Sequence, residues 1–399
     1  MNSFSSEAVD EIAEAPPRAI PWPQDRQIPV GGWQPPAGDV IVSADDHVME
    51  PVDLWVDRMP AQYQETAPRL WKDDGGYHLE IEGRSFDKPG FNSQLIEGRE
   101  GMDDQSIRLA DMDAGGVDIS VIFPQRAMGL FVIQDQEKLT AAADAYNVWL
   151  SEWCANAPDR FVGVPILPTI HEPSEAPAYV ERLKGLGFKA LMLPSYPRGV
   201  RYNSSAMEPM WQAIADSGLT LCFHVGEFGF STGKGALLTY ITKQMQSFRE
   251  LWSLLTFSGM LERHPTLKVM FTEGGAGWVA SAAYEADRIY QQYITEAKPK
   301  LQNLPSYYWK RNCSATIMDD PLALREIDTI GAENVLFSTD YPHPEGVLGE
   351  EGRVLKNIYD TLSPKDARLV AGENAIRIFG LEEQAARVLA QRTSQSAKN

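Results

Sequence analysis

The chain has 399 residues, 43% of them hydrophobic, so it is long enough to bury the core of one barrel-sized domain with extensions. Its 36 basic and 55 acidic side chains give a formal charge of −19, which argues against nucleic acid and anionic membrane surfaces as partners. The charge does not exclude an anionic small-molecule substrate, because a metal ion or an arginine can invert the field inside a pocket.

The cysteines and the amino terminus bear on the cellular compartment. Cys154, Cys222 and Cys313 are odd in number, far apart and set in apolar surroundings, which predicts reduced, buried thiols. The amino terminus has no basic region followed by an apolar run, and no stretch approaches the roughly 18 apolar residues of a membrane span. We therefore expect a soluble cytoplasmic protein.

Three regions follow one another along the chain. Residues 1–40 are acidic at first and then rich in proline, without a steady helix or strand period, and this predicts an extended amino-terminal arm. Residues 41–381 alternate between short apolar runs and longer helix-like stretches. Residues 382–399 are polar and are expected to form a helix or tail.

The alternation over 41–381 is typical of repeated βα units around a parallel sheet. The apolar or β-branched runs lie at 41–44, 117–123, 161–167, 189–193, 219–223, 267–272, 312–316 and 335–339. Eight strands with intervening helices close most simply into a (β/α)8 barrel, so we predict an α/β fold of the TIM-barrel type.

Two long connections interrupt this regular pattern. Residues 56–105 follow the first strand and include a hairpin-like alternation from Tyr77 onward, which predicts an inserted cap. Residues 225–244 are rich in glycine and are predicted to form a mobile lid.

Polar side chains stand at the carboxyl ends of four predicted strands, where a barrel carries its catalytic groups. The first strand ends in Asp45-Asp46-His47, and the others are followed by His224, Glu273 and Asp340. In a strand, Asp45 and His47 point to the same side and Asp46 to the other. A lone strand-end aspartate is often a helix N-cap and a lone histidine is often a core residue, but their coincidence on four strands predicts a metal site. Two histidines and two carboxylates suit Zn²⁺ or Mn²⁺.

Several segments, in this order along the chain, resemble the amidohydrolase superfamily, of the amidohydrolase-2 type. The resemblance is greatest to the branch around aminocarboxymuconate-semialdehyde decarboxylase and the hydroxybenzoate decarboxylases. The matching segments are DDHVMEP at 45–51, RLADMDAGGVD at 108–118, GFKALML at 187–193, ERHPTLKV at 262–269, STDYPH at 338–343 and GENAIRIFGL at 372–381.

The resemblance implies one divalent metal held by Asp45, His47, His224 and Asp340. The chain departs from the family pattern at two positions. Asp45 stands where many members have histidine, although decarboxylases of hydroxybenzoates similarly have a carboxylate there. Glu273 stands where the family usually has an acid–base histidine. Glutamate can transfer protons in the same way if burial raises its pKa, and whether it instead binds metal is left open.

The branch's usual reaction is non-oxidative cleavage of a carbon–carbon bond in a phenol or vinylogous acid, so the resemblance implies a decarboxylase. Asp340 or Glu273 would deliver the proton, and His343 would orient the substrate, unless it is only a polar residue of a proline-fixed loop. The alternatives are a hydrolase of an amide, lactone or β-dicarbonyl, an aldehyde-releasing lyase, and a barrel that binds without catalysis.

A flat aromatic substrate needs aromatic neighbours and a cation. Phe123, Trp278 and Phe228 lie near strand ends or in loops, although most such aromatics pack in cores or lids. Arg126 follows the second strand and is either a carboxylate clamp or part of an ion pair. The family further implies a homodimer or higher homo-oligomer.

Overall fold

The computed structural model describes residues 20–29, 32–87, 93, 97–226, 233–244 and 247–396. Within these ranges, eight parallel strands overlap the eight runs predicted from the sequence. Their bounds are β1 (Val42–Val48), β5 (Ile119–Pro124), β6 (Phe161–Gly163), β7 (Ala190–Leu193), β8 (Thr220–His224), β9 (Lys268–Thr272), β10 (Cys313–Ile317) and β11 (Val335–Phe337).

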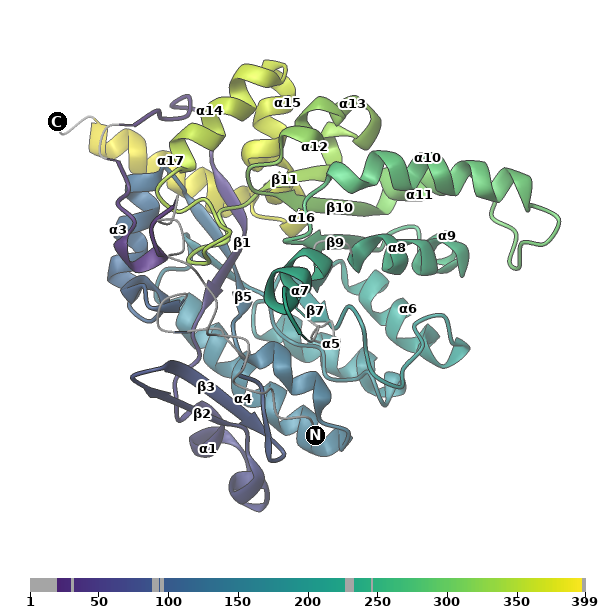
Figure 1. The fold of residues 1–399 in the computed structure, drawn as a ribbon, viewed down its shortest axis with the longest axis horizontal. Coiled ribbons are helices and arrows are strands. Elements are labelled where there is room, and N and C mark those ends of the chain that lie inside the picture. The colour runs from purple at the N-terminus through teal and green to yellow at the C-terminus, as the bar shows by residue number, and fades with distance from the viewer. Residues whose placement is uncertain are drawn as a thin grey trace.

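The strands pair in the order β1-β5-β6 and β7-β8-β9-β10-β11, and isolated parallel bridges join the two sets. Between β6 and β7, the Met192 amide donates to the Pro165 carbonyl at 2.8 Å. Between β1 and the end of β11, the His47 amide donates to the Tyr341 carbonyl at 2.8 Å. The eight strands therefore form a ring, and the predicted TIM-barrel fold is confirmed (Figure 1).

Helices alternate with the barrel strands and cover the outside of the ring (Figure 1). Their bounds are α1 (Leu54–Arg58), α3 (Gln105–Gly115), α4 (Gln136–Ala155), α5 (Ala176–Gly185), α6 (Glu208–Ser217), α7 (Ala236–Gln244), α8 (Ser247–Phe257), α9 (Met260–Arg263), α10 (Gly277–Gln292), α11 (Pro305–Asn312), α12 (Pro321–Arg325), α13 (Ile327–Ile330), α14 (Glu351–Thr361), α15 (Pro364–Arg368), α16 (Asn374–Phe379) and α17 (Glu382–Ser396).

Local sequence signals explain where these elements begin and end. The Asp104 carboxylate accepts from the amides of the first turn of α3, and Gly116 ends that helix in the left-handed conformation. Asp135 caps α4 through the Lys138 amide. The barrel strands are buried on both faces, as expected of a parallel sheet enclosed by helices, so they are nearly continuous apolar runs.

The insertion after β1 carries a small antiparallel sheet, which lies outside the barrel beside α1 (Figure 1). Its strands are β2 (Arg69–Asp73), β3 (Gly76–Ile81) and β4 (Arg84–Ser85), so the hairpin expected around Tyr77 is present. In β3, Tyr77, Leu79 and Ile81 alternate inward and are buried.

The described part of the amino-terminal arm packs against a loop at the end of β11. The Arg26 guanidinium donates to the carbonyls of Pro344 and Gly346 in that loop, the latter at 2.9 Å. The expected lid lies partly outside the described residues, since 227–232 are not among them. No helix in the described ranges is both long and apolar enough to cross a membrane.

Candidate active site

The polar residues predicted at four strand ends lie at one end of the barrel. Asp45 and His47 belong to β1, and His224 is the last residue of β8. Glu273 directly follows the buried end of β9, and Asp340 is the third residue after the buried end of β11. All five side chains are buried, and the parallel strands bring their carboxyl ends to the same face of the barrel.

Glu273 and Asp340 adopt a backbone conformation that is unusual for residues other than glycine. Their φ angles are 70° and 52°, in the left-handed region. Each is held by a hydrogen bond of its own amide: Glu273 donates to the Thr316 hydroxyl at 2.8 Å, and Asp340 donates to the Asp45 carbonyl at 2.9 Å. Such strained positions cluster at functional sites and persist only where the surrounding structure imposes them.

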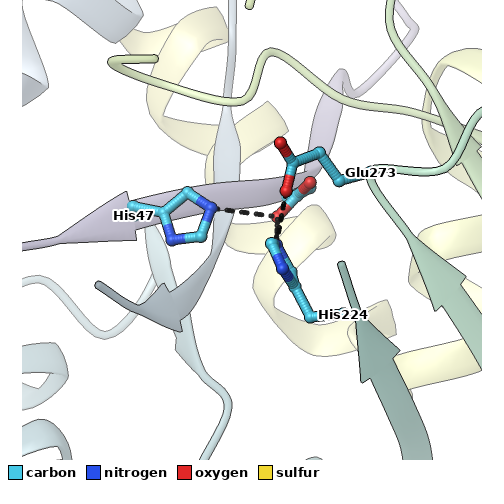
Figure 2. A group of neighbouring side chains, drawn as sticks. His47, His224 and Glu273 are labelled. Atoms are coloured by element: carbon cyan, nitrogen blue, oxygen red, sulfur yellow. Dashed lines mark hydrogen bonds and ion pairs between the residues drawn. The ribbon is translucent and has the colours of Figure 1, made fainter. Parts of the chain in front are cut away.

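Four side chains converge into one group: Asp45, His47, His224 and Glu273. His224 Nε2 lies 3.2 Å from Asp45 Oδ1 and 3.4 Å from Glu273 Oε2, and His47 Nε2 lies 3.8 Å from Asp45 Oδ1. Figure 2 shows the imidazoles of His47 and His224 and the carboxylate of Glu273 pointing toward one another, from β1, β8 and the loop after β9. One ligand atom from each of the four lies within 4.8 Å of all the others.

Asp340 borders this group and extends it. Its Oδ1 atom lies 3.5 Å from His47 Nε2 and 2.8 Å from His343 Nδ1. Asp340 also forms a second acidic group with Glu273 and Glu345. The structure therefore brings together every metal ligand and proton donor predicted from the sequence, and it adds Glu345. The signal for Glu345 was its place two residues after His343, in the same loop after β11.

The donor set fits a divalent cation. The Nδ1 atoms of His47 and His224 lie 3.1 and 2.8 Å from the carbonyls of Pro124 and Val225, which turns both Nε2 atoms toward the group of four. Among the buried polar atoms without a hydrogen-bond partner in the described structure are His47 Nε2 and one oxygen each of Asp45 and Asp340. Leaving such atoms unpaired is costly, and a Zn²⁺ or Mn²⁺ ion would satisfy all three.

Burial and like charges set the protonation of the site. Burial raises the pKa of Glu273 well above its usual range, and the nearby Asp340 carboxylate raises it further. Burial and Asp45 do the same to the pKa of Asp340. Burial lowers the pKa of His47 well below its usual range, which keeps this imidazole neutral and able to bind a metal. A bound cation would in turn favour the ionised form of the carboxylates that ligate it.

Asp46 faces away from the group of four, as the strand period predicted. Its carboxylate accepts from the hydroxyls of Ser120 and Thr339 and from the Tyr341 amide, the last at 2.9 Å. The cationic Arg108 lies close enough to oppose the rise in the pKa of Asp46 that burial causes. Asp46 thus links β1 to β5 and to the end of β11 behind the metal ligands.

Arg108 holds β1 from behind and was not recognised as a site residue from the sequence. The residue is fully buried. Its guanidinium donates to the backbone carbonyl of His47 and to that of Gly101, the latter at 3.0 Å, and lies 4.4 Å from the centre of the Tyr341 ring. The only signal in the sequence was its place at the head of the RLADMD segment.

The predicted substrate-binding aromatics lie in different surroundings. Phe123 is fully buried, with its ring centre 5.1 Å from that of His224, so it forms a flat wall of the site. Trp278 packs in an aromatic cluster, with ring centres 5.5 Å from Trp309 and 6.4 Å from Trp252. Phe228 lies outside the described residues.

Arg126 is held by the insertion. Its Nη2 atom pairs with Glu97 Oε2 at 2.5 Å and donates to the Tyr77 carbonyl at 3.2 Å. Its backbone amide donates to the Glu50 carboxylate, which also accepts from the Ala127 amide at 2.8 Å. Of the two readings of Arg126 drawn from the sequence, the structure shows the ion pair, and the pair is largely buried.

Comparison with known proteins places this geometry in context. The family described as Amidohydrolase matches residues 52–381. The 2-amino-3-carboxymuconate-6-semialdehyde decarboxylase of Dictyostelium discoideum is 23% identical over 290 residues, which cover 70% of this chain and 77% of that protein.

Solved structures share the fold. The crystal structure of an amidohydrolase from Mycobacterium avium subsp. paratuberculosis superposes with a TM-score of 0.74 and 18% identity, covering 86% of this chain and 99% of the other. A dihydroxybenzoic acid decarboxylase from Polaromonas, solved with bound manganese and the inhibitor 2-nitroresorcinol, gives a TM-score of 0.62 and 19% identity, with coverage of 86% and 97%.

Proposed function

The chain belongs to the amidohydrolase family, and from this membership we propose that it is a metal-dependent carbon–carbon lyase that decarboxylates a hydroxylated aromatic or vinylogous acid. The observation that carries the proposal is the group of two imidazoles and several carboxylates at the carboxyl ends of the barrel strands, with buried atoms that lack partners. The decarboxylases among its relatives support the reaction class.

We assign the cation to Asp45, His47, His224 and Asp340, and proton transfer to Glu273. Exposure supports this division. Asp340 is fully enclosed, and one of its oxygens is buried without a partner, whereas Glu273 is 6% exposed. A ligand is best enclosed, while an acid must reach the substrate. The relatives' use of manganese and the oxygen-rich donor set favour Mn²⁺, with Zn²⁺ as the other candidate.

The reaction follows from these positions. When bound, a divalent cation supplies positive charge that orients and neutralises the substrate's phenolate or carboxylate oxygens. The raised pKa of Glu273 favours the protonated carboxyl, the form that can act as a general acid. Glu273 donates this proton to the ring carbon that bears the carboxylate. The bond from that carbon to the carboxylate then breaks, carbon dioxide leaves, and the ring regains its aromaticity. Phe123 packs against the flat substrate during these steps.

Two carboxylate variants test the division of roles. We expect Glu273→Gln to keep its bound metal and to lose about 100- to 10,000-fold in kcat, the usual contribution of a positioned acid. Asp340→Asn should lose the metal itself. Glu383→Gln, at a highly exposed position on α17, is the matched control and should change neither. The division is wrong if Glu273→Gln is metal-free or if Asp340→Asn retains full metal content.

A hydrolase is the second candidate, and one observation favours it. Three arginines around the site are engaged elsewhere. Arg126 pairs with Glu97, Arg108 lies buried behind β1, and Arg26 donates to backbone carbonyls of the loop after β11. A substrate carboxylate would then rely on the cation rather than on these arginines, so a substrate without one, such as an amide, a lactone or a β-dicarbonyl, also fits. Product analysis separates the candidates. Carbon dioxide released in step with a phenol supports the lyase, and hydrolytic products without carbon dioxide support the hydrolase.

The remaining proposals concern assembly and domain limits. We propose that the chain forms a homodimer or higher homo-oligomer, which light scattering on the purified protein would measure. The domain limits of 41–381 for the barrel and 56–105 for the insertion remain predictions, and limited proteolysis would test them.

A further inference from the structure

The amino-terminal arm brings one buried arginine to residues 341–347, which we call the β11 loop. Arg26 is 5% exposed, and a backbone carbonyl accepts from each nitrogen of its guanidinium. Its Nη1 atom donates to Gly346 at 2.9 Å, its Nη2 atom donates to Pro344, and its Nε atom donates to Pro21 of the arm at 3.1 Å. One side chain therefore joins the arm to two points of the β11 loop.

The β11 loop is folded against the backbone of Asp340. The His343 amide donates to the Asp340 carbonyl at 2.8 Å, and the Val347 amide donates to the Thr339 carbonyl at 2.9 Å. Gly346 approaches the same two carbonyls closely, since a side-chain carbon on it would come within 2.5 Å of the Thr339 oxygen and 2.7 Å of the Asp340 oxygen. A contact that holds Gly346 in place therefore also holds the backbone of Asp340.

The arm is itself held at this point by the insertion. Arg99 Nη1 donates to the carbonyls of Arg26 and Pro23, at 2.8 and 3.3 Å. The Nε and Nη2 atoms of Arg99 pair with the Asp111 carboxylate at 2.8 and 2.6 Å. Asp111 also accepts from the Tyr341 hydroxyl at 2.7 Å. The arm at Arg26 is thus fixed on two sides, by the insertion and by the β11 loop.

We propose that Arg26 is a positioning residue, which holds the β11 loop in the conformation that places Asp340 and His343 beside the group of four. A guanidinium suits this task because its donors form a fixed planar fork that can span two carbonyls, whereas an ammonium is a compact point charge. Arg26 precedes residues 52–381, which match the family, so the family match does not account for this contact. The effect of Arg26 on catalysis rests on the function proposed above, but its effect on the loop does not.

Two variants of Arg26 and one control isolate the contact. Arg26→Met removes every donor and keeps much of the buried stem. Arg26→Lys keeps the charge but replaces the planar fork by a single ammonium. Arg353→Met is the matched control, because Arg353 is 55% exposed on α14 and pairs with Asp319 and Glu350, outside the β11 loop.

Hydrogen exchange of the backbone amides, followed by mass spectrometry on the purified full chain, measures how often the β11 loop opens. In Arg26→Met we expect the amides of 341–347 to exchange about 10- to 100-fold faster than in the wild type, the change that corresponds to losing one hydrogen bond from a charged donor. Arg26→Lys should lie between the two, and Arg353→Met should match the wild type. A role in overall stability alone would accelerate only the amides that exchange through global unfolding.

The exchange rates of the β11 loop decide the proposal. Wild-type rates at 341–347 in a folded Arg26→Met protein overturn it. If Arg26→Met does not fold, Arg26→Lys decides by the same measure, and wild-type rates in that variant likewise overturn the proposal.

Kinetics connect the loop to the reaction. With a substrate in hand and excess metal, Arg26→Met should lower kcat by about 10- to 100-fold, the usual effect of removing a partner that orients a metal-site group, with KM unchanged. Arg26→Lys should recover part of kcat. A loss confined to KM, or an unchanged kcat in both variants, contradicts a positioning role. The exchange measurement needs neither substrate nor metal, so a failed decarboxylase assay beside the expected exchange rates rejects the proposed function alone.

Discussion

Glu50 gives a quantitative test of how the site's supporting loop is built. Its carboxylate is buried and accepts from the amides of Arg126 and Ala127, which begin the loop after β5. Burial raises its pKa from 4.5 to about 7. The folded protein therefore holds a proton that the unfolded chain releases above pH 4.5, so the contribution of Glu50 to stability falls as the pH rises from about 4.5 through about 7.

The expected size follows from the shift. At about 1.4 kcal/mol per pKa unit, the stability lost across this range is about 3 kcal/mol. Glu50→Gln keeps an oxygen acceptor for the two amides but does not titrate. Urea unfolding of both proteins at pH 5, 6, 7 and 8 should show that the free energy of unfolding of the wild type decreases with pH relative to that of the variant. The decrease should approach about 3 kcal/mol at pH 8. Glu351, whose pKa burial also raises to about 7, is present in both proteins and cancels. If the difference in the free energy of unfolding between the wild type and Glu50→Gln is the same at all four pH values, the reasoning is refuted.

Three further predictions concern the site and its support. Arg108→Met leaves the buried Asp46 carboxylate without its cation, and we expect a loss of roughly 3–5 kcal/mol in the free energy of unfolding, measured in urea; a loss below about 1 kcal/mol would contradict this role. Phe123→Leu removes an aromatic wall, so KM for an aromatic substrate should rise by about fivefold, corresponding to about 1 kcal/mol, while metal content stays constant. Metal at about 1,000 times its Kd should stabilise the fold by about 4 kcal/mol, so chelation should lower the melting temperature by about 5 °C, and an unchanged melting curve would argue against a resident cation.

The barrel and the metal group were predictable because they depend on local signals. Each strand is a short apolar run, and the parallel arrangement brings the carboxyl ends of all strands to one face. Polar residues at those ends, such as His224 and Asp340, therefore lie close together regardless of the conformation of the loops. The strand period also separated Asp46 from its neighbours Asp45 and His47, and the structure agrees.

The contacts that support the site were not predictable in the same way. Gln125 contacts Glu97 and His343 only because the insertion folds back over the end of β5. The periodicity of the sequence does not predict where the insertion packs. Arg126 shows the same limit, since its sequence suits a substrate clamp as well as an ion pair, and only the position of Glu97 distinguishes them. Arg108 was missed because a buried arginine that serves backbone carbonyls leaves no pattern in the sequence.

The most direct test of the account is metal content. Elemental analysis of the purified wild type should find about one divalent ion per chain, and His47→Ala and His224→Ala should each contain almost none while remaining folded by circular dichroism. A wild type without stoichiometric metal, or variants that bind it as well as the wild type does, would contradict the assignment of this strand-end group as a metal centre.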